Sequence, residues 1–299
     1  MDLKDAAAAT RELLADYVPS DPAPTAAALR VLWLGAVPLQ PPGLEPEQEK
    51  LRRDLGLDDS GYESAGVPVP VLTAVGQEIG KVARKQVTGY LPLVRLLWGR
   101  YGREGRIVAA VGLGPMELAD PELVVPEIYD MAQTCVSWED CDQLSMKALE
   151  PVMRRDPDNW LERMGTWVTD DVKWVQRAGL TAIGRLAMVQ AEYTSRCVDL
   201  LAPALGDGDR DVKRALSFAL RLSARGEVGP VKGFVQANKD VTDADSVWVL
   251  CDVIRSGWKV QLPEFADLLP IYQAWLETAE PQARRSVQSA VRTLERVQP

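Results

Sequence analysis

The apolar positions of the chain recur at intervals of three and four residues, the spacing of the buried face of an α-helix. Residues 3–17 and 25–35 predict two N-terminal helices, and the Pro-rich stretch AVPLQPPGLEP (36–46) predicts a connection. Beyond Tyr62, helical segments follow one another, separated by short Gly, Pro or Asp signals, and no segment alternates as a strand would. Examples are VLTAVGQEIGKVARK, GYLPLVRLLWGR, PEIYDMAQT and DNWLERMGTWV. The pattern predicts an all-α protein.

An internal repeat organises these helices. TWVTDDVKWVQRAGL (166–180) aligns with PALGDGDRDVKRALS (203–217) at an offset of 37 residues, and AEPQARRSVQSAV (279–291) is a weaker copy. The aligned pairs are Asp170 with Asp207, Val175 with Val212, Arg177 with Arg214 and Ala178 with Ala215. We expect the Asp to cap the following helix, the Val to pack against the preceding helix and the Ala to allow close approach. Such a period is typical of helix-pair solenoids, here with roughly six to eight hairpins.

Composition limits the chemistry of the chain. Ala, Leu, Arg and Glu are abundant while Thr, Ile and Phe are scarce, which favours helix over sheet. The 299 residues include no histidine, and this excludes Ser-His-Asp and Cys-His catalysis as well as histidine-ligated metals. An enzyme of this composition must therefore use carboxylates, aromatic rings, arginines or lysines.

The cysteines and the N-terminal segment predict the compartment. The chain forms no CxxC pair, so we expect buried free thiols in a reducing cytosol instead of a disulfide framework or a zinc site; the cysteines are Cys135, Cys141, Cys197 and Cys251. The first residues lack a basic-then-apolar signal, and no apolar run approaches the ~18 residues that a membrane span needs. These features predict a cytoplasmic protein.

Charge is unevenly distributed along the chain. The net charge of −9 argues against a nucleic-acid partner. Residues 81–115, however, contain seven basic residues and one acid, whereas residues 116–150 contain nine acids and one base. Because local charge decides what a surface binds, the total does not settle the partner.

Five motifs carry a resemblance to a known family: SAGVPVPVLTAVGQEIG (64–80), LVRLLWGRYGREGRIVAAVGL (93–113), SWEDCDQL (137–144), DDVKWVQRAGL (170–180) and DVKRALSFALR (211–221). In this order they resemble the G-V-x-x-P-x-L-R, L-W-x-x-x-x-x-E-x-R, W-[DE]-x-[VC]-D, D-x-x-W-x-R-R-A and x-x-K-A-I-G-W-x-L-R elements of the AlkD-like DNA alkylation repair proteins. The resemblance covers roughly residues 60–237, and the spacing is kept without a gap from Asp142 to Arg177. SWEDCDQL is its sharpest part.

The resemblance implies an α-solenoid of HEAT-like helical hairpin repeats that forms a concave surface, in a monomeric protein. Three segments are then expected, packed as one solenoid domain. Residues 1–60 hold the N-terminal helices and the Pro-rich connection, residues 61–237 the AlkD-like core, and residues 238–299 additional C-terminal helical hairpins.

The family's members are glycosylases that excise cationic N3- and N7-alkylated purines from DNA. The resemblance therefore implies hydrolysis of the N-glycosidic bond in double-stranded DNA that carries such purines, with no cofactor, metal or membrane. Cleavage develops oxocarbenium character on the sugar, which an anion and an electron-rich ring can stabilise. Asp142 would be that anion and would position the attacking water, while Trp138, at i−4, shares its helix face. Phe218 stands where the family usually has a third aromatic residue, a Trp.

Basic residues on the second helices of the repeats are expected to contact DNA phosphates. Arg177 matches the family's Arg at that position. Lys213, Arg214 and Arg221 occupy comparable places one repeat later, and Arg185, two turns beyond Arg177, extends the track.

Three departures from the family leave alternatives open. Phe218 lacks the indole donor, and residues 183–196 carry fewer lysines than comparable family segments, with none in this stretch. The C-terminal hairpins with Trp248, Trp258 and Trp275 either lengthen or cover the groove. One alternative is a non-catalytic helical-repeat protein that binds DNA structures or protein partners. Another is a generic scaffold in which Trp138 is a core residue and Asp142 a helix cap, and low solvent exposure of both residues would favour it.

Overall fold

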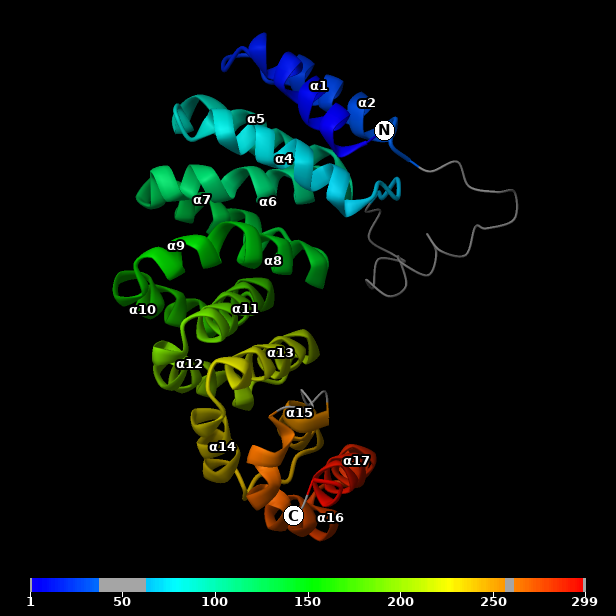
Figure 1. Cartoon of the computed structure of the whole chain (residues 1–299), viewed down its shortest axis with the longest axis vertical. Coiled ribbons are helices and arrows are strands. Elements are labelled where there is room, and N and C mark those ends of the chain that lie inside the picture. Colours follow the sequence, from blue (N-terminus) through cyan, green and yellow to red (C-terminus); the bar gives the residue numbers. More distant parts are fainter. Residues whose placement is uncertain (1, 38–62, 256–260, 298–299) are drawn as a thin grey trace, which may run out of the picture. The chain divides into compact units, whose positions relative to one another are not determined.

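The computed structural model describes residues 2–37, 63–255 and 261–297, and every regular element within these ranges is a helix (Figure 1). The all-α prediction is therefore confirmed. The expected connection from residue 38 onward and Trp258 lie outside the described residues. The chain divides into two compact units, Met1–Val152 and Met153–Pro299. Across the described part of the chain, no helix combines the length and the apolar character that crossing a bilayer requires.

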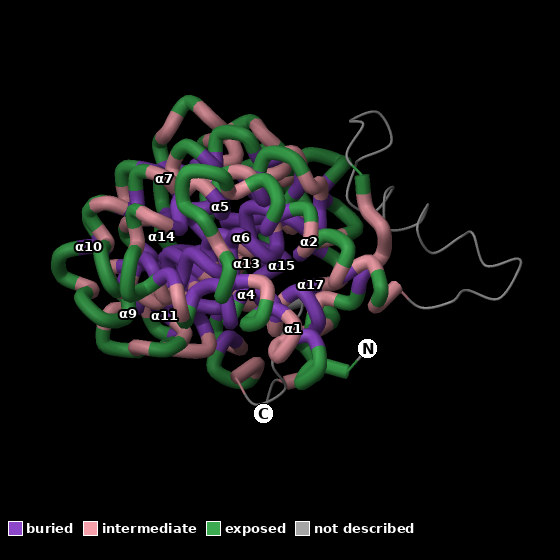
Figure 2. Tube along the Cα trace, turned by 90° about the horizontal axis from the view of Figure 1, so that it is seen from above, coloured by how far each residue is buried: buried purple, intermediate pink, exposed green. Residues whose placement is uncertain are grey.

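The first unit is a stack of helical hairpins. Its helices are α1 (Leu3–Ala15), α2 (Ala23–Leu34), α4 (Val69–Ala83), α5 (Val87–Arg100), α6 (Gly102–Ala119), α7 (Pro121–Gln133) and α8 (Trp138–Leu144), followed by a π-helical turn, Ser145–Leu149, and by α9 (Glu150–Arg155), which runs across the unit boundary. One layer of the stack is formed by α1, α4 and α6, which pack in that order, while α2 and α5 contact each other in the second layer. Most residues of α6 are buried, as the purple tube in Figure 2 shows.

The second unit repeats this arrangement. Its α-helices are α10 (Pro157–Val168), α11 (Lys173–Val189), α12 (Thr194–Leu201), α13 (Arg210–Gly226), α14 (Val228–Ala237), α15 (Ala244–Arg255), α16 (Leu269–Thr278) and α17 (Arg284–Glu295). Short 3-10 turns connect them at Ala191–Tyr193, Ala202–Gly206, Leu262–Leu268 and Pro281–Ala283. Helix α11 packs on α13, α13 on α15 and α15 on α17, while α10, α12 and α14 lie in the second layer. This is the predicted solenoid of helical hairpins.

The internal repeat is visible in the helix boundaries. Helices α11 and α13 begin at Lys173 and Arg210, which are offset by the same 37 residues as the aligned sequences. Val175, Val212, Ala178 and Ala215 are all fully buried, as expected for the packing positions of the motif.

The capping role predicted for the repeated Asp is wrong. Asp170 Oδ1 accepts a hydrogen bond from the Val172 amide (2.8 Å), and Asp207 Oδ1 accepts one from the Asp209 amide (2.6 Å). Each carboxylate therefore shapes the turn before the helix. The cap of α13 is Asp209, which accepts from the Asp211 amide at 2.7 Å.

The four cysteines are buried free thiols, as predicted. Burial raises the pKa of Cys197 and of Cys251 to about 12, so both thiols stay protonated at neutral pH. The extent of the three expected segments, and the concave surface, remain predictions.

Candidate functional site

The pair singled out from the sequence lies on α8. Ser137 caps this helix, because its hydroxyl accepts a hydrogen bond from the Asp140 amide at 3.2 Å. Trp138 is the first residue of α8, and its exposed fraction is 39%. Asp142 follows one turn later and is only 7% exposed. The scaffold alternative expected low exposure of both residues, with Trp138 in the core and Asp142 as a cap. Trp138 is exposed and the cap is Ser137, which contradicts it, whereas the low exposure of Asp142 is what it expected.

Two salt bridges from α6 fix the first turn of α8. Glu139 receives a bidentate pair of hydrogen bonds from Arg103, at 2.7 Å to Nε and 2.8 Å to Nη2. Asp140, which is buried, accepts from Arg106 at 2.9 Å and from the Val136 amide at 3.1 Å. Since Glu139 and Asp140 are consecutive and both are held, the helix has little freedom to rotate about its axis. Because Trp138 and Asp142 belong to the same helix, the orientation of both residues is fixed as well.

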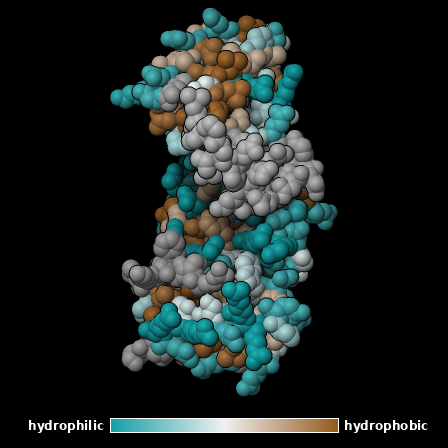
Figure 3. All heavy atoms as spheres, turned by 90° about the vertical axis from the view of Figure 1, so that its right-hand side faces the viewer, coloured by the Kyte–Doolittle hydropathy of each residue, from teal (hydrophilic) through white to brown (hydrophobic). Residues whose placement is uncertain are grey.

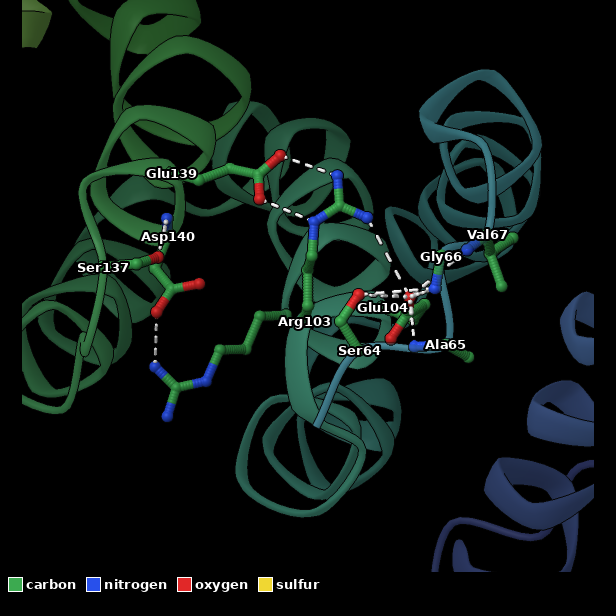
Figure 4. Close-up of polar contacts among 10 residues, drawn as sticks. Ser64, Ala65, Gly66, Val67, Arg103, Glu104, Ser137, Glu139 and Asp140 are labelled. Atoms are coloured by element: carbon green, nitrogen blue, oxygen red, sulfur yellow. Dashed lines mark hydrogen bonds and ion pairs between the residues drawn. The ribbon is translucent and has the colours of Figure 1, made fainter. Parts of the chain in front are cut away.

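The same network reaches back to the segment before α4. Glu104 Oε1 accepts hydrogen bonds from the backbone amides of Ala65 (3.0 Å), Gly66 (3.1 Å) and Val67 (3.4 Å), and Figure 4 shows these contacts beside Arg103. Arg103 Nη1 lies 3.9 Å from Glu104 Oε1, so a single guanidinium joins the two carboxylates. A buried chain of charge-assisted bonds thus links residues 64–67 to α8.

A glycine makes the start of α6 compatible with this network. Gly102 has a φ of 57°, and a Cβ on it would overlap with the carbonyl oxygen of Glu63. That carbonyl accepts a hydrogen bond from the Arg103 amide at 3.0 Å. A side chain at residue 102 would therefore displace the backbone next to Arg103.

A π-helical turn follows α8 directly. Ser145 at its start is buried, and its hydroxyl donates to the carbonyl oxygen of Cys141 at 2.7 Å. The turn packs against α6 at Gly114, where a Cβ would overlap with the Lys147 carbonyl oxygen. Such turns are frequent at functional sites, because they change which side chains face a surface. Here the π-helical turn begins at Ser145, so it changes which side chains face the surface shortly after Asp142.

Part of the uneven charge distribution of the sequence corresponds to ion pairs between successive repeats. Arg95 pairs with Glu127 (Nε to Oε2, 2.7 Å), Arg103 with Glu139 and Arg106 with Asp140, at separations of 32, 36 and 34 residues. Three of the seven basic residues of 81–115 thus pair with three of the nine acids of 116–150. These three pairs join neighbouring helices of the stack.

The other predicted site residues belong to the second unit, on α11 and α13. Arg177 is buried, and its Nη1 donates to the carbonyl oxygen of Asp211 at 3.2 Å. Lys213 is also buried, and its ammonium donates to the Leu205 carbonyl oxygen and to Ser246 Oγ (2.8 Å). Burial lowers the pKa of Lys213, while the carboxylates of Asp243, Asp245 and Asp207 oppose that shift. Hydrogen bonds to other parts of the protein therefore hold the side chains of both Arg177 and Lys213 in place.

The remaining predicted residues of this unit are more exposed. Arg214 is half-exposed and lies 3.8 Å from Asp211. Phe218 and Arg221 are close together, with the guanidinium carbon 5.7 Å from the ring centroid, and Arg221 also pairs with Asp252 at 3.3 Å. Arg185, on α11, is partly buried and lies near Arg225, whose pKa is lowered by burial and by the charges of Arg185 and Arg221.

We expect disruption of the Arg103–Glu139 pair to cost more than a surface ion pair would. Arg103→Met leaves Glu139 without its bidentate partner in a site that is only 13% exposed, and should lower the free energy of unfolding by about 3 kcal/mol. Urea unfolding of Arg103→Met, Glu139→Gln and the double variant measures the coupling. A matched control is Arg196→Met, whose partners Asp158 and Glu162 are exposed. Equal losses for Arg103→Met and Arg196→Met would contradict a structural role for the network.

Comparison with known proteins agrees with these observations. A family model described as DNA alkylation repair enzyme matches residues 50–246, about two thirds of the chain. The matched range includes α8 with Trp138 and Asp142, together with α11 and α13. Neither the curated proteins nor the solved structures gave a match. The chain belongs to the DNA alkylation repair enzyme family, and its function accordingly lies in the repair of alkylated DNA.

Proposed function

We propose that this protein is a DNA glycosylase that excises cationic N3- and N7-alkylated purines by hydrolysing the N-glycosidic bond. The observation that supports the proposal most is the pairing, on one helical turn, of an exposed Trp138 ring with a largely buried Asp142 carboxylate. No cofactor is required, because the alkylated purine is already a good leaving group.

The two side chains have complementary tasks in this reaction. As the bond to the purine breaks, positive charge develops on the sugar, and a carboxylate next to it lowers the energy of that state. Asp142 is shielded from most solvent, so water screens its charge less than that of a surface carboxylate. It would also orient the attacking water molecule. Trp138 offers an electron-rich ring face to the cationic lesion.

The second unit would supply contacts to the DNA backbone. Arg185, Arg214 and Arg221 have side chains that are at least partly accessible, and we assign them to phosphates, with Phe218 as a ring beside the DNA. Arg177 and Lys213 are buried and bonded to backbone carbonyls, so they would contact phosphates only by moving toward the surface. Their first task is therefore to hold α11 and the turn before α13 in place for the exposed arginines.

The direct test is release of the free base from a defined substrate. We expect the full chain to release 7-methylguanine or 3-methyladenine from a duplex that carries one alkylated purine, measured by chromatography of the freed base. The unmodified duplex is the control substrate, and the uncatalysed loss of the base gives the background. Release no faster than this background would overturn the proposal.

The alternative function is binding without catalysis, to DNA structures or to protein partners. It is favoured by the hydrogen bonds that hold the Arg177 and Lys213 side chains on backbone carbonyl oxygens of the protein. The net charge of −9 also favours it. Saturable binding of the alkylated duplex without any base release would support it.

A further inference from the structure

A polar pocket of about 350 Å³ lies in the second unit, where the first turns of α13 and α15 meet the start of α17. It is lined by Arg210, Lys213, Arg214, Ala244, Asp245, Trp248, Gln282 and Ser286. Trp248, Gln282 and Ser286 lie beyond residue 246, where the family match ends. Hydrophilic side chains predominate on the face of the C-terminal helices drawn in the lower part of Figure 3. The size falls at the lower end of ligand pockets, about 300–1,000 Å³.

The basic side chains of the pocket lie on one face of α13, at i, i+3 and i+4. Arg210 is exposed and forms no ion pair with any described residue, and Arg214 is half-exposed. The carboxylate nearest to Arg214 is Asp211, which binds Lys173 more closely, at 2.9 Å. Lys213 lies at the base of the pocket, bonded to Ser246 Oγ. The pocket therefore offers two guanidinium groups to an anion.

The neighbouring carboxylates are mostly engaged. Asp243 accepts a hydrogen bond from the Ser246 amide at 2.9 Å, and Glu280 accepts one from the Ala244 amide at 3.1 Å. Among the described residues, Asp245 is the one carboxylate that lines the pocket. Since the amides of Ala244, Ser246 and Val247 at the start of α15 already have partners, an anion here would be recognised mainly by side chains.

Trp248 gives the pocket an aromatic wall. It is half-buried, it lies one turn after Ala244 on α15, and no described residue accepts a hydrogen bond from its indole nitrogen. Base stacking on aromatic side chains is tolerant of sequence because every base has a flat face. The amide of Gln282, the hydroxyl of Ser286 and the carboxylate of Asp245 can all form hydrogen bonds with the polar edge of a base.

We propose that this pocket binds one nucleotide unit, with the base stacked on Trp248 and the phosphate held by Arg210 and Arg214. The inference does not depend on base excision, because it concerns residues outside α8 and an undamaged nucleotide. The nucleotide has two sources with the same chemistry, a free mononucleotide and an unpaired nucleotide of a DNA strand.

The test is calorimetric titration of the full chain with dAMP, adenosine, inorganic phosphate and a short single-stranded oligodeoxyadenylate. We expect saturable binding of dAMP or of the oligonucleotide, tighter than the binding of adenosine or phosphate. Trp248→Ala and Arg210→Gln should each weaken it about tenfold, and Trp248→Phe, which keeps a ring, should weaken it less. Binding of dAMP identifies a free nucleotide as the ligand, and binding of the oligonucleotide alone identifies the strand.

Arg292→Gln, an exposed arginine on α17 away from the pocket, is the matched charge control and should bind as the wild type does. Thermal melts show whether each variant is folded, and Trp248→Phe preserves the test if Trp248→Ala unfolds. The proposal is overturned if none of the four ligands binds, if phosphate alone binds as tightly as dAMP, or if Trp248→Phe and Arg210→Gln both bind as the wild type does.

Discussion

Asp142→Asn is expected to lower the rate of base release by about 100- to 1,000-fold while leaving the protein folded and able to bind DNA. The substitution keeps the size of the side chain and removes the negative charge that would face the developing oxocarbenium ion. Asp142 is largely buried, so no mobile solvent anion can easily replace it. The measurement is single-turnover release of 7-methylguanine from a duplex, together with duplex affinity.

The control for this prediction is Asp130→Asn, which removes the same charge from an exposed position on α7 in the same unit. Its rate should equal that of the wild type. If Asp142→Asn retains the wild-type rate, Asp142 is not the stabilising anion, even if the protein proves to be a glycosylase. If Asp142→Asn instead loses duplex affinity in proportion to its rate, the carboxylate acts in binding and not in the transition state.

The second large effect concerns stability and its dependence on pH. Glu117 on α6 is fully buried, and neither of its carboxyl oxygens has a hydrogen-bond partner among the described residues. Burial, and then the charge of the nearby Glu150, raise the pKa of Glu117 from 4.5 to about 10. The folded protein therefore keeps a neutral Glu117 at pH 7, while the unfolded chain would ionise it.

The direction of the effect follows from proton binding. Between about pH 4.5 and pH 10 the folded state binds one more proton at Glu117 than the unfolded state does, so stability falls as the pH rises. At pH 7 the loss relative to pH 4.5 is on the order of 3 kcal/mol, as an upper bound. We expect Glu117→Gln to abolish this slope, measured by urea unfolding at several pH values from 5 to 9.

Glu12→Gln is the control, because Glu12 is exposed on α1 and should leave the slope unchanged. A wild-type slope that persists in Glu117→Gln would show that Glu117 is not the group responsible. The buried carboxyl lies on the helix that carries Arg103 and Arg106, so this measurement also reports on the scaffold that orients α8.

Much of the fold follows from local sequence signals. The three- and four-residue spacing of apolar positions predicted α1 and α2 to within two residues, because each helix buries a single apolar face. The repeat at 166–180 and 203–217 predicted the offset between α11 and α13, since equivalent helices must bury equivalent Val and Ala residues. The Asp of the repeat was assigned to the wrong position, because Asp shapes a turn and caps a helix through the same local hydrogen bonds.

The candidate site was harder to predict from the sequence than the fold was. Trp138 and Asp142 follow from a motif of consecutive residues, and the structure adds that one is exposed and the other largely buried. Glu104 and Arg106 stand in the L-W-x-x-x-x-x-E-x-R motif, but they and Arg103 were missed as positioning residues, because their partners are 34–39 residues away and belong to other elements. The available signals were that motif and the basic stretch followed by an acidic stretch, which favours pairing between neighbouring repeats. Glu117 carried no signal, since burial of a lone carboxyl is a property of the packed fold.

The ion pairs between successive repeats have a consequence for how such a chain can change over evolution. Apolar contacts between repeats are interchangeable, so an array held by them alone tolerates the loss or duplication of a unit. Arg103 and Arg106, by contrast, each require an acid in the next repeat at one defined place. Deleting the repeat that carries these acids would remove both carboxylates from guanidinium side chains that are only 7% and 12% exposed, at about 3–5 kcal/mol for each broken pair. These ion pairs therefore fix the order of the repeats around α8. New hairpins can be added with least disruption at the ends of the chain.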